Sequence, residues 1–502
     1  MLKRNIAANF VGQIYAAGIS IVMLPVYVRH LGAEAYGLVG FLTMLQAWCQ
    51  LIDLGLTPTL SRELSRFKAG ILPGSEVATM VRSTEWLMGG VGAACAGTVA
   101  LAAGWIARDW LKAQQLPQDE IIRCLIMMGG ILATRWLVGL YRGGLAGLEQ
   151  MVPLNLAGIV LATLRAVGVM AVLLFWTTRP AGFFAYQLVV ALVELVVMKM
   201  LFYRAFPMRG AGWHPVMRSL RGVLGLATTM ALLTGLWVVI SQTDKLVLSW
   251  TLDLPSYGFY MVVVALAGGI SLLAGPLSQA LQPRFTVLAS RGDHASLVRL
   301  YRASTQATCA GVFAVAGVMA CFAAPLLQAW TNNLAAVRSS AGILPLYALG
   351  NAVSALLVLA FLIQFAYGRL RWHVIGNCVF ALIWLPGVWL AAQRAGAVGV
   401  GWIWLLGNVV YLVGWVPVVH HHLLPGLGWR WLVWDVGVIL LAEAGMLALI
   451  AQMDLATLGR PGVFAALALV TAGVALVGLL AGGESRPALL RLTRSLLVAK
   501  SA

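Results

Sequence analysis

Long apolar stretches recur along the whole chain and are separated by short polar segments. Each stretch holds about 20 residues, the length that an α-helix needs to cross the hydrocarbon core of a bilayer. The stretches are continuously apolar, whereas the strands of a membrane β-barrel alternate between apolar and polar residues, so a barrel is excluded. The pattern predicts an all-α polytopic membrane protein with about 14 transmembrane helices. The predicted spans are 7–28, 36–58, 84–106, 121–141, 153–176, 183–203, 223–245, 257–281, 303–323, 342–365, 372–392, 398–419, 433–452 and 462–481.

The composition supports a membrane protein. Hydrophobic residues make up 61% of the chain and charged residues only 10%, against about 25% charged residues in a soluble domain. Lys and Arg concentrate in alternate loops, beginning with the N-terminal segment, and this bias predicts that both termini are cytoplasmic. The formal net charge of +17 is then expected to face anionic membrane lipids rather than nucleic acid.

Cysteine and histidine give no sign of a metal site or of disulfides. The 6 cysteines lie within apolar segments and show no C-x-x-C spacing. His420, His421 and His422 are consecutive, so their side chains diverge around a helix instead of converging on an ion. No metal and no cofactor are expected, and a coupling proton or Na⁺ stays open.

A motif near the start of the chain recurs in its second half. Tyr36-Gly37 and Tyr257-Gly258 each precede an apolar span of similar length. Two copies of a six-span unit are typical of transporters built from two related lobes. We therefore expect two pseudo-symmetric six-helix lobes plus two extra C-terminal helices. The predicted division is an N-terminal lobe at 1–203, a cytoplasmic linker at 204–221, a C-terminal lobe at 222–419, accessory spans at 420–481 and a basic amphipathic cytoplasmic tail at 482–502.

The stretch from Ser241 to Phe285 carries the most informative pattern. An Asp244-Lys245 pair ends one apolar span, a short loop leads to Tyr257-Gly258, and a second apolar span follows. That span is closed by Pro276, Gln279, Gln282 and Pro283. The arrangement resembles the polysaccharide (O-antigen/Wzx-type) flippase family of the multidrug/oligosaccharidyl-lipid/polysaccharide exporter superfamily.

The resemblance implies a function and a location. A member of this family would translocate an undecaprenyl-pyrophosphate-linked oligosaccharide across the bacterial inner membrane by alternating access. Its product would supply O-antigen, capsule or exopolysaccharide. The implied partners are the lipid-linked glycan, membrane lipids, a polysaccharide polymerase and a chain-length regulator. The sequence leaves the sugar, the coupling ion and the oligomeric state open.

Cations inside the predicted spans are the first candidate site residues. A charge at the bilayer centre costs roughly 2.5–3.5 kcal/mol on insertion scales unless it faces water or a partner. Arg165 lies deep in span 153–176, Arg135 lies nearer the inner end of its span, and Lys245 ends the span before the Tyr257-Gly258 loop. Arg165 is expected either to line a cavity or to form a structural ion pair, and Arg135 either to line that cavity or to reach the membrane interface. The resemblance implies that both, together with Lys245, attract a pyrophosphate or acidic sugars.

Two acidic residues are candidates for ion coupling or for charge pairing. Glu194 lies near the middle of span 183–203 and is expected either to neutralise Arg165 or Arg135 or to bind a coupling cation or proton. Asp244 adjoins Lys245, and adjacent side chains on a helix point about 100° apart. We therefore expect that these two do not simply neutralise each other, and the resemblance implies that both face the central cavity.

Asp53 and Arg62 are candidates for a structural or gating role. Asp53 ends span 36–58 and is followed by Gly55 and Pro58. It is expected to cap or hinge the helix there and to pair with Arg62 or Arg66.

Three other functions stay open. A lipid II flippase would share the fold and a cationic cavity. A multidrug/toxin cation antiporter would share the fold but needs an acidic cavity. A membrane polysaccharide polymerase or ligase usually needs a large outer loop, and the loops here are short. We therefore expect a transporter and not an enzyme.

Overall fold

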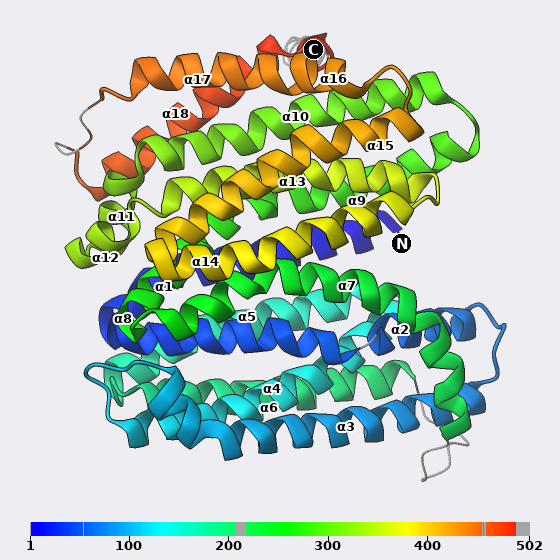
Figure 1. The fold of residues 1–502 in the computed structure, drawn as a ribbon. Coiled ribbons are helices and arrows are strands. Elements are labelled where there is room, and N and C mark those ends of the chain that lie inside the picture. The colour runs from blue at the N-terminus through cyan, green and yellow to red at the C-terminus, as the bar shows by residue number, and fades with distance from the viewer. Residues whose placement is uncertain (1, 54, 207–216, 454, 456–457, 488–502) are drawn as a thin grey trace, which may run out of the picture. The chain divides into compact units, whose positions relative to one another are not determined.

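The structure is a computed structural model that describes residues 2–53, 55–206, 217–453, 455 and 458–487 (Figure 1). All regular secondary structure in these residues is helical, apart from one isolated β-bridge between Lys112 and Asp253. The chain groups into two compact units, Met1–Met261 and Val262–Ala502. Each unit is described separately below.

The first unit is built from long helices and two short helical turns. They are α1 (Leu2–Cys49), the 3₁₀ turn η1 (Gln50–Asp53), α2 (Leu56–Lys68), α3 (Gly74–Trp105), the π-helical turn η2 (Ile106–Trp110), α4 (Gln118–Gly147), α5 (Met151–Phe175), α6 (Pro180–Ala205), α7 (Met217–Thr251) and the first part of α8 (Leu254–Gly268). Helix α4 packs against both α3 and α6, and α5 packs against both α1 and α6. Figure 1 shows these helices running alongside one another.

The second unit continues from α8 and places α10 at its centre. Its elements are α9 (Ser271–Ser290), α10 (His294–Cys321), α11 (Ala323–Thr331), α12 (Leu334–Ser340), α13 (Leu344–Ala366), α14 (Arg371–Val410), η3 (Tyr411–Trp415), α15 (Val416–Leu423), α16 (Gly428–Trp431), η4 (Leu432–Gly437), α17 (Val438–Ile450) and α18 (Arg460–Ala481). Helix α10 contacts α9, α13, α17 and α18. The two predicted accessory spans therefore pack on α10.

The helical membrane fold predicted from the sequence is confirmed. Within the described residues, 11 helical segments are long and apolar enough to cross a membrane. Two of these, Val11–Asp53 and Arg371–Leu423, run for 43 and 53 residues, and each is long enough for two spans at about 20 residues per crossing. The total of fourteen stays a prediction.

The two longest segments break where the sequence predicted a loop. Gly32 has φ 83° and Gly396 has φ 56°, values in the left-handed region that glycine adopts without a Cβ clash. Gly32 lies between the predicted spans 7–28 and 36–58, and Gly396 lies between 372–392 and 398–419. A single glycine therefore serves as the turn at each site.

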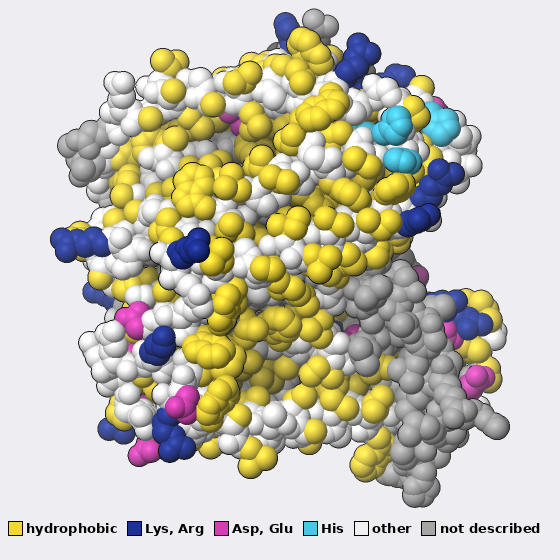
Figure 2. All heavy atoms as spheres, viewed as in Figure 1, with side chains coloured by type: hydrophobic (Ala, Val, Ile, Leu, Met, Phe, Trp, Pro, Cys, Tyr) yellow, Lys and Arg dark blue, Asp and Glu magenta, His cyan; other side chains and the backbone are white. Residues whose placement is uncertain are grey.

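The lipid-facing surface of each unit is apolar. Large hydrophobic side chains such as Leu101, Leu441 and Leu469 are at least 75% exposed. Figure 2 shows hydrophobic side chains along the flanks of the helices, while Lys, Arg, Asp and Glu gather toward the helix ends. This distribution matches the cost of placing charges in hydrocarbon.

The predicted division into lobes stays a prediction. Helix α7, which the sequence assigned to the C-terminal lobe, contacts α1, α2, α3 and η1 of the first unit. Most of the predicted linker 204–221 and of the predicted tail 482–502 lies outside the described residues.

Candidate functional site

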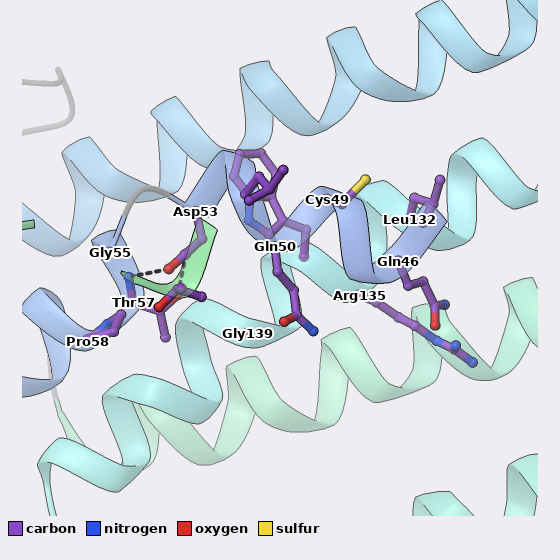
Figure 3. A pocket seen from close by; sticks show the side chains of 13 residues that line it. Gln46, Cys49, Gln50, Asp53, Gly55, Thr57, Pro58, Leu132, Arg135 and Gly139 are labelled. Atoms are coloured by element: carbon purple, nitrogen blue, oxygen red, sulfur yellow. Dashed lines mark hydrogen bonds between the residues drawn. The ribbon is translucent and has the colours of Figure 1, made fainter. Parts of the chain in front are cut away.

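A cavity of about 460 Å³ opens among the helices of the first unit (Figure 3). Its walls come from α1, η1, α2, α4 and α7. The lining residues are Gln46, Cys49, Gln50, Leu51, Asp53, Gly55, Thr57, Pro58, Leu132, Arg135, Trp136, Gly139 and Thr234. Most of the polar groups among them are amides, hydroxyls or N–H donors, with one arginine and one carboxylate.

The break between η1 and α2 builds one wall of this cavity. Gly55 has φ 77° and turns the chain in the left-handed region before α2 begins. Asp53 then accepts hydrogen bonds from the backbone N–H of Thr57 at 3.3 Å and from its hydroxyl at 2.7 Å (Figure 3). The carboxylate thereby caps the first turn of α2. Its negative charge is held by these two hydrogen bonds.

Three donors on the cavity walls are buried and unpartnered within the described residues. They are Nε2 of Gln46, Nε of Arg135 and Nε1 of Trp136. Figure 3 shows the side chains of Gln46 and Arg135 extending in the same direction from α1 and α4. A buried donor without a partner costs about 1–3 kcal/mol, so the cavity suits a ligand that is rich in acceptor oxygens.

Arg135 also belongs to a polar chain that crosses three helices. It donates to Oε1 of Gln187 at 3.2 Å, and Gln187 donates in turn to the carbonyl oxygen of Arg165 at 3.4 Å. Arg165 contacts Glu194 at 2.5 Å, and Arg142 contacts the other oxygen of Glu194 at 3.3 Å. Two guanidinium groups therefore share one carboxylate. Arg135 joins the same chain of bonds through Gln187, so the cluster keeps an excess of positive charge.

The structure thus brings together three of the predicted site residues, Arg135, Arg165 and Glu194. Glu194 is paired with Arg165, one of the two outcomes expected from the sequence. Arg142 follows the predicted span 121–141 and is not among the predicted site residues. Its position seven residues after Arg135, two helical turns along the same face of α4, is the signal that could have found it.

Lys245 and Asp244 form a pair, so the expectation that they do not neutralise each other is wrong. Lys245 Nζ lies 3.0 Å from Asp244 Oδ1 and also donates to the carbonyl oxygen of Ser241 at 2.6 Å. Tyr260 donates to the same carboxylate at 2.8 Å. The long, flexible lysine side chain turns back along α7 and overcomes the divergence of adjacent Cβ atoms. Neither residue is among those that line the cavity.

The sequence predicts that Asp53 pairs with Arg62 or Arg66. In the described residues, both arginines pair with Glu63 instead. Arg62 contacts Glu63 at 3.7 Å and Arg66 contacts the same carboxylate at 2.9 Å. Glu63 lies on α2 itself, next to Arg62 and three residues before Arg66, so it reaches both cations at little cost. Asp53 instead receives its hydrogen bonds from Thr57.

One end of the first unit is predicted from the sequence to face the outside of the membrane. Polar contacts join three segments at this end. Glu34 accepts from the backbone N–H groups of Gln114 and Gln115 at 2.7 and 3.0 Å. Gln114 donates to Asp253 at 2.6 Å, and the N–H of Leu254 donates to the carbonyl oxygen of Lys112 at 3.0 Å. These bonds tie together α1, the segment before α4, and the α7–α8 junction. None of these contacts was predicted.

Comparison with known proteins agrees with this architecture. The sequence matches a family model described as polysaccharide biosynthesis protein over residues 2–288, whereas no curated protein sequence matches significantly. The fold is similar to that of the lipid II flippase MurJ in an inward closed conformation, with a TM-score of 0.73, 11% identity and coverage of 93% of this chain and 97% of that chain.

Two further solved structures are similar over most of their length. One is a multidrug resistance MATE family transporter of the MOP superfamily in an inward-facing conformation, with a TM-score of 0.63, 15% identity and coverage of 81% of this chain and 94% of that chain. The other is a MOP superfamily transporter from Pyrococcus furiosus, with a TM-score of 0.54, 16% identity and coverage of 84% and 96%. At these identities the likeness shows the fold.

Proposed function

Since this chain belongs to the polysaccharide biosynthesis protein family, we propose that it is a flippase for an undecaprenyl-pyrophosphate-linked oligosaccharide. It works in the bacterial inner membrane with both termini in the cytoplasm. The glycan that it delivers serves the synthesis of a surface polysaccharide, either O-antigen, capsule or exopolysaccharide. A polysaccharide polymerase and a chain-length regulator act on the product.

The observation that carries the proposal is the set of unpartnered donors on the cavity walls. Gln46, Arg135 and Trp136 line one cavity of about 460 Å³, and each carries a buried N–H without a partner among the described residues. A pyrophosphate supplies several acceptor oxygens and negative charge, and charge-assisted hydrogen bonds are roughly twice as strong as neutral ones. The excess of arginine around Glu194 adds a positive field beside the cavity, since Arg142 lies on α4 together with Arg135.

The contacts at the predicted outer end fit one state of an alternating-access cycle. Glu34, Gln114, Asp253 and Leu254 close that end within the first unit. A headgroup would enter from the cytoplasmic side while this end is closed, and it would leave after these bonds break. The prenyl tail stays in the lipid, because a hydrocarbon chain that is already surrounded by lipid has no apolar surface to remove from water.

Lipid II transport is the second candidate, because the chain shares its fold with the flippase MurJ over 93% of its length. Both candidate substrates carry a prenyl pyrophosphate, so the cavity donors serve either one. The sugars distinguish them. A multidrug cation antiporter is less well supported, since Asp53, the one carboxylate among the lining residues, is already held by Thr57.

Reconstitution in lipid vesicles tests the proposal. A fluorescent prenyl-pyrophosphate glycan is placed in both leaflets, and its exposure is followed with a quencher that does not cross the membrane. We expect wild-type protein and Arg291→Ala, a variant at an exposed loop position, to equilibrate the glycan. Arg135→Ala should lose this activity, and Arg135→Lys should keep part of it.

Other outcomes identify the other functions. Transport of lipid II with no transport of the glycan would replace the proposal by the second candidate. Uptake of a cationic dye in exchange for protons or Na⁺, without transport of either the lipid-linked glycan or lipid II, would show an antiporter. In the native host, deletion of the gene should leave lipid-linked glycan on the cytoplasmic face of the membrane.

A further inference from the structure

A buried carboxyl in the second unit has no partner among the described residues. Glu443 lies on α17, it is 2% exposed, and both of its carboxyl oxygens are buried without a hydrogen bond in the described part of the chain. The residue stands in the middle of an apolar run and is not among the site residues that the sequence predicts.

The side chain fills a notch where α10, α17 and α18 meet. Gly478 of α18 faces it so closely that a methyl group on this glycine would overlap Oε1 of Glu443. The same methyl would lie 3.0 Å from the Cβ of Ala310 on α10. One turn further along α17, Leu447 packs with Val318, Phe322 and Val474 in an apolar cluster. The carboxyl is therefore faced by a glycine of α18 and an alanine of α10, and an apolar cluster begins one turn away along α17.

The charged groups of these helices are engaged elsewhere. On α10, Arg302 contacts Asp435 at 2.9 Å and Glu484 at 3.0 Å, and Asp435 also accepts from Gln306 at 2.5 Å. On α18, Arg460 donates to the carbonyl oxygen of Ala329 at 2.8 Å. These bonds hold each cation in place.

The other titratable groups on these elements do not offer a cation to Glu443 either. The buried thiol of Cys309 on α10 faces the carbonyl oxygen of Val436 at 3.9 Å. Tyr301, two turns earlier, pairs with His420 at 2.9 Å. The remaining titratable groups of α10 are exposed, namely His294, Arg299 and Cys321.

A carboxylate anion in this notch would be costly. An ionised group taken out of water without a partner loses far more free energy than a neutral one, so such a group binds a proton instead. The other deep carboxylates differ, since Glu194 is held by two arginines and Asp244 by Lys245 and Tyr260. Protonation of either would break an ion pair.

We infer that Glu443 is a proton-binding site of the transport cycle. It carries a proton while α17 and α18 are packed on α10, and it releases that proton when the packing opens and admits water. One proton enters the carboxyl from water on one side of the membrane and returns to water on the other. This inference rests on the proposed transport function and adds the ion to which transport is coupled.

Two measurements on the full-length protein test it, with Glu443→Gln as the variant and Glu76→Gln as the matched control. Glu76 is exposed in the first turn of α3. Infrared spectra at neutral pH should show the carbonyl band of a protonated carboxyl in wild type and in the control. The band should be missing in Glu443→Gln. An unchanged spectrum in that variant would overturn the inference.

The second measurement uses vesicles with an imposed pH difference. We expect the gradient to drive glycan accumulation by wild type and by Glu76→Gln. In Glu443→Gln, transport should fall to the level seen without a gradient, while a thermal unfolding scan matches wild type. A full response to the gradient in this variant would refute the proton role. The infrared result needs no transport, so failure of the flippase proposal and failure of this inference can be told apart.

Discussion

Gly37 and Gly258, the two glycines of the repeated Tyr-Gly motif, pack against each other's helix within the first unit. A methyl group on Gly37 would lie 2.6 Å from the carbonyl oxygen of Leu254, and one on Gly258 would overlap the carbonyl oxygen of Ala33. Ala33 precedes Gly37 by four residues, as Leu254 precedes Gly258, so the two contacts are equivalent under the repeat. The motif therefore uses glycine because the two backbones meet there.

A side chain at this crossing should open the predicted outer end. We expect Gly258→Ala to destabilise the closed state by about 1–3 kcal/mol, the usual cost of overpacking a tight contact. The measurement is the rate at which a membrane-impermeant maleimide labels Ser256→Cys, a half-buried position in the first turn of α8, in an otherwise cysteine-free protein. Labelling should rise in the Gly258→Ala background.

Gly268→Ala is the matched control for this crossing. Gly268 lies on the same helix, α8, and a Cβ there meets no atom within 4 Å in the described structure. Its labelling rate should equal that of the parent protein. Equal rates in the Gly258→Ala protein would show that the glycine crossing does not hold this end closed.

The donors of Arg135 should set the affinity for the pyrophosphate. Hydrogen bonds to charged groups contribute about 1.5–3 kcal/mol each, so Arg135→Ala should weaken the binding of a prenyl pyrophosphate by roughly 10–100-fold. Arg135→Lys keeps the charge but loses the planar fork of donors and should fall between. Calorimetry with the pyrophosphate and with the matching monophosphate measures both effects. A loss of the same size for a neutral prenyl alcohol would count against recognition of the phosphates.

The Glu194 carboxylate should contribute to stability through its two arginines. Loss of one partner of a buried pair costs about 3–5 kcal/mol, and the cost here should lie below that range because Arg165 and Arg142 are 33% and 47% exposed. We expect Glu194→Ala to lower the melting temperature and Glu194→Gln, which keeps the shape, to lower it less. If both variants have the melting temperature of wild type, the pair does not stabilise the fold. That result would favour the other predicted role of Glu194, the binding of a coupling ion.

The pair formed by Asp244 and Lys245 can be measured with a double-mutant cycle. Asp244→Asn and Lys245→Met are each expected to reduce the free energy of unfolding, since Asp244 is only 2% exposed. The double variant should lose less than the sum of the two, with a coupling energy of about 0.5–3 kcal/mol. Strict additivity would mean that the two side chains act independently, as the sequence alone had suggested.

Some of the charge arrangement could be predicted from the sequence, and some could not. Glu194 and Arg165 lie in neighbouring apolar spans, and the cost of isolated charges in a bilayer made their pairing one of two expected outcomes. Arg142 was missed because the predicted span ends at 141, whereas α4 continues to Gly147 and includes Arg142. The Asp244–Lys245 pair was missed because side-chain flexibility is absent from a helical-wheel argument.

The sequence alone determined the membrane-spanning helices, and it indicated turns at the points where Gly32 and Gly396 break the helices. Backbone polar groups in hydrocarbon must be satisfied within a helix, so apolar run length is enough to locate these elements. The tertiary structure decided which polar groups meet: the donors of Gln46 and Arg135 at one cavity, and Glu443 facing Gly478 without a partner. Those relations depend on the rotation and crossing of packed helices, which hydrophobic length does not encode.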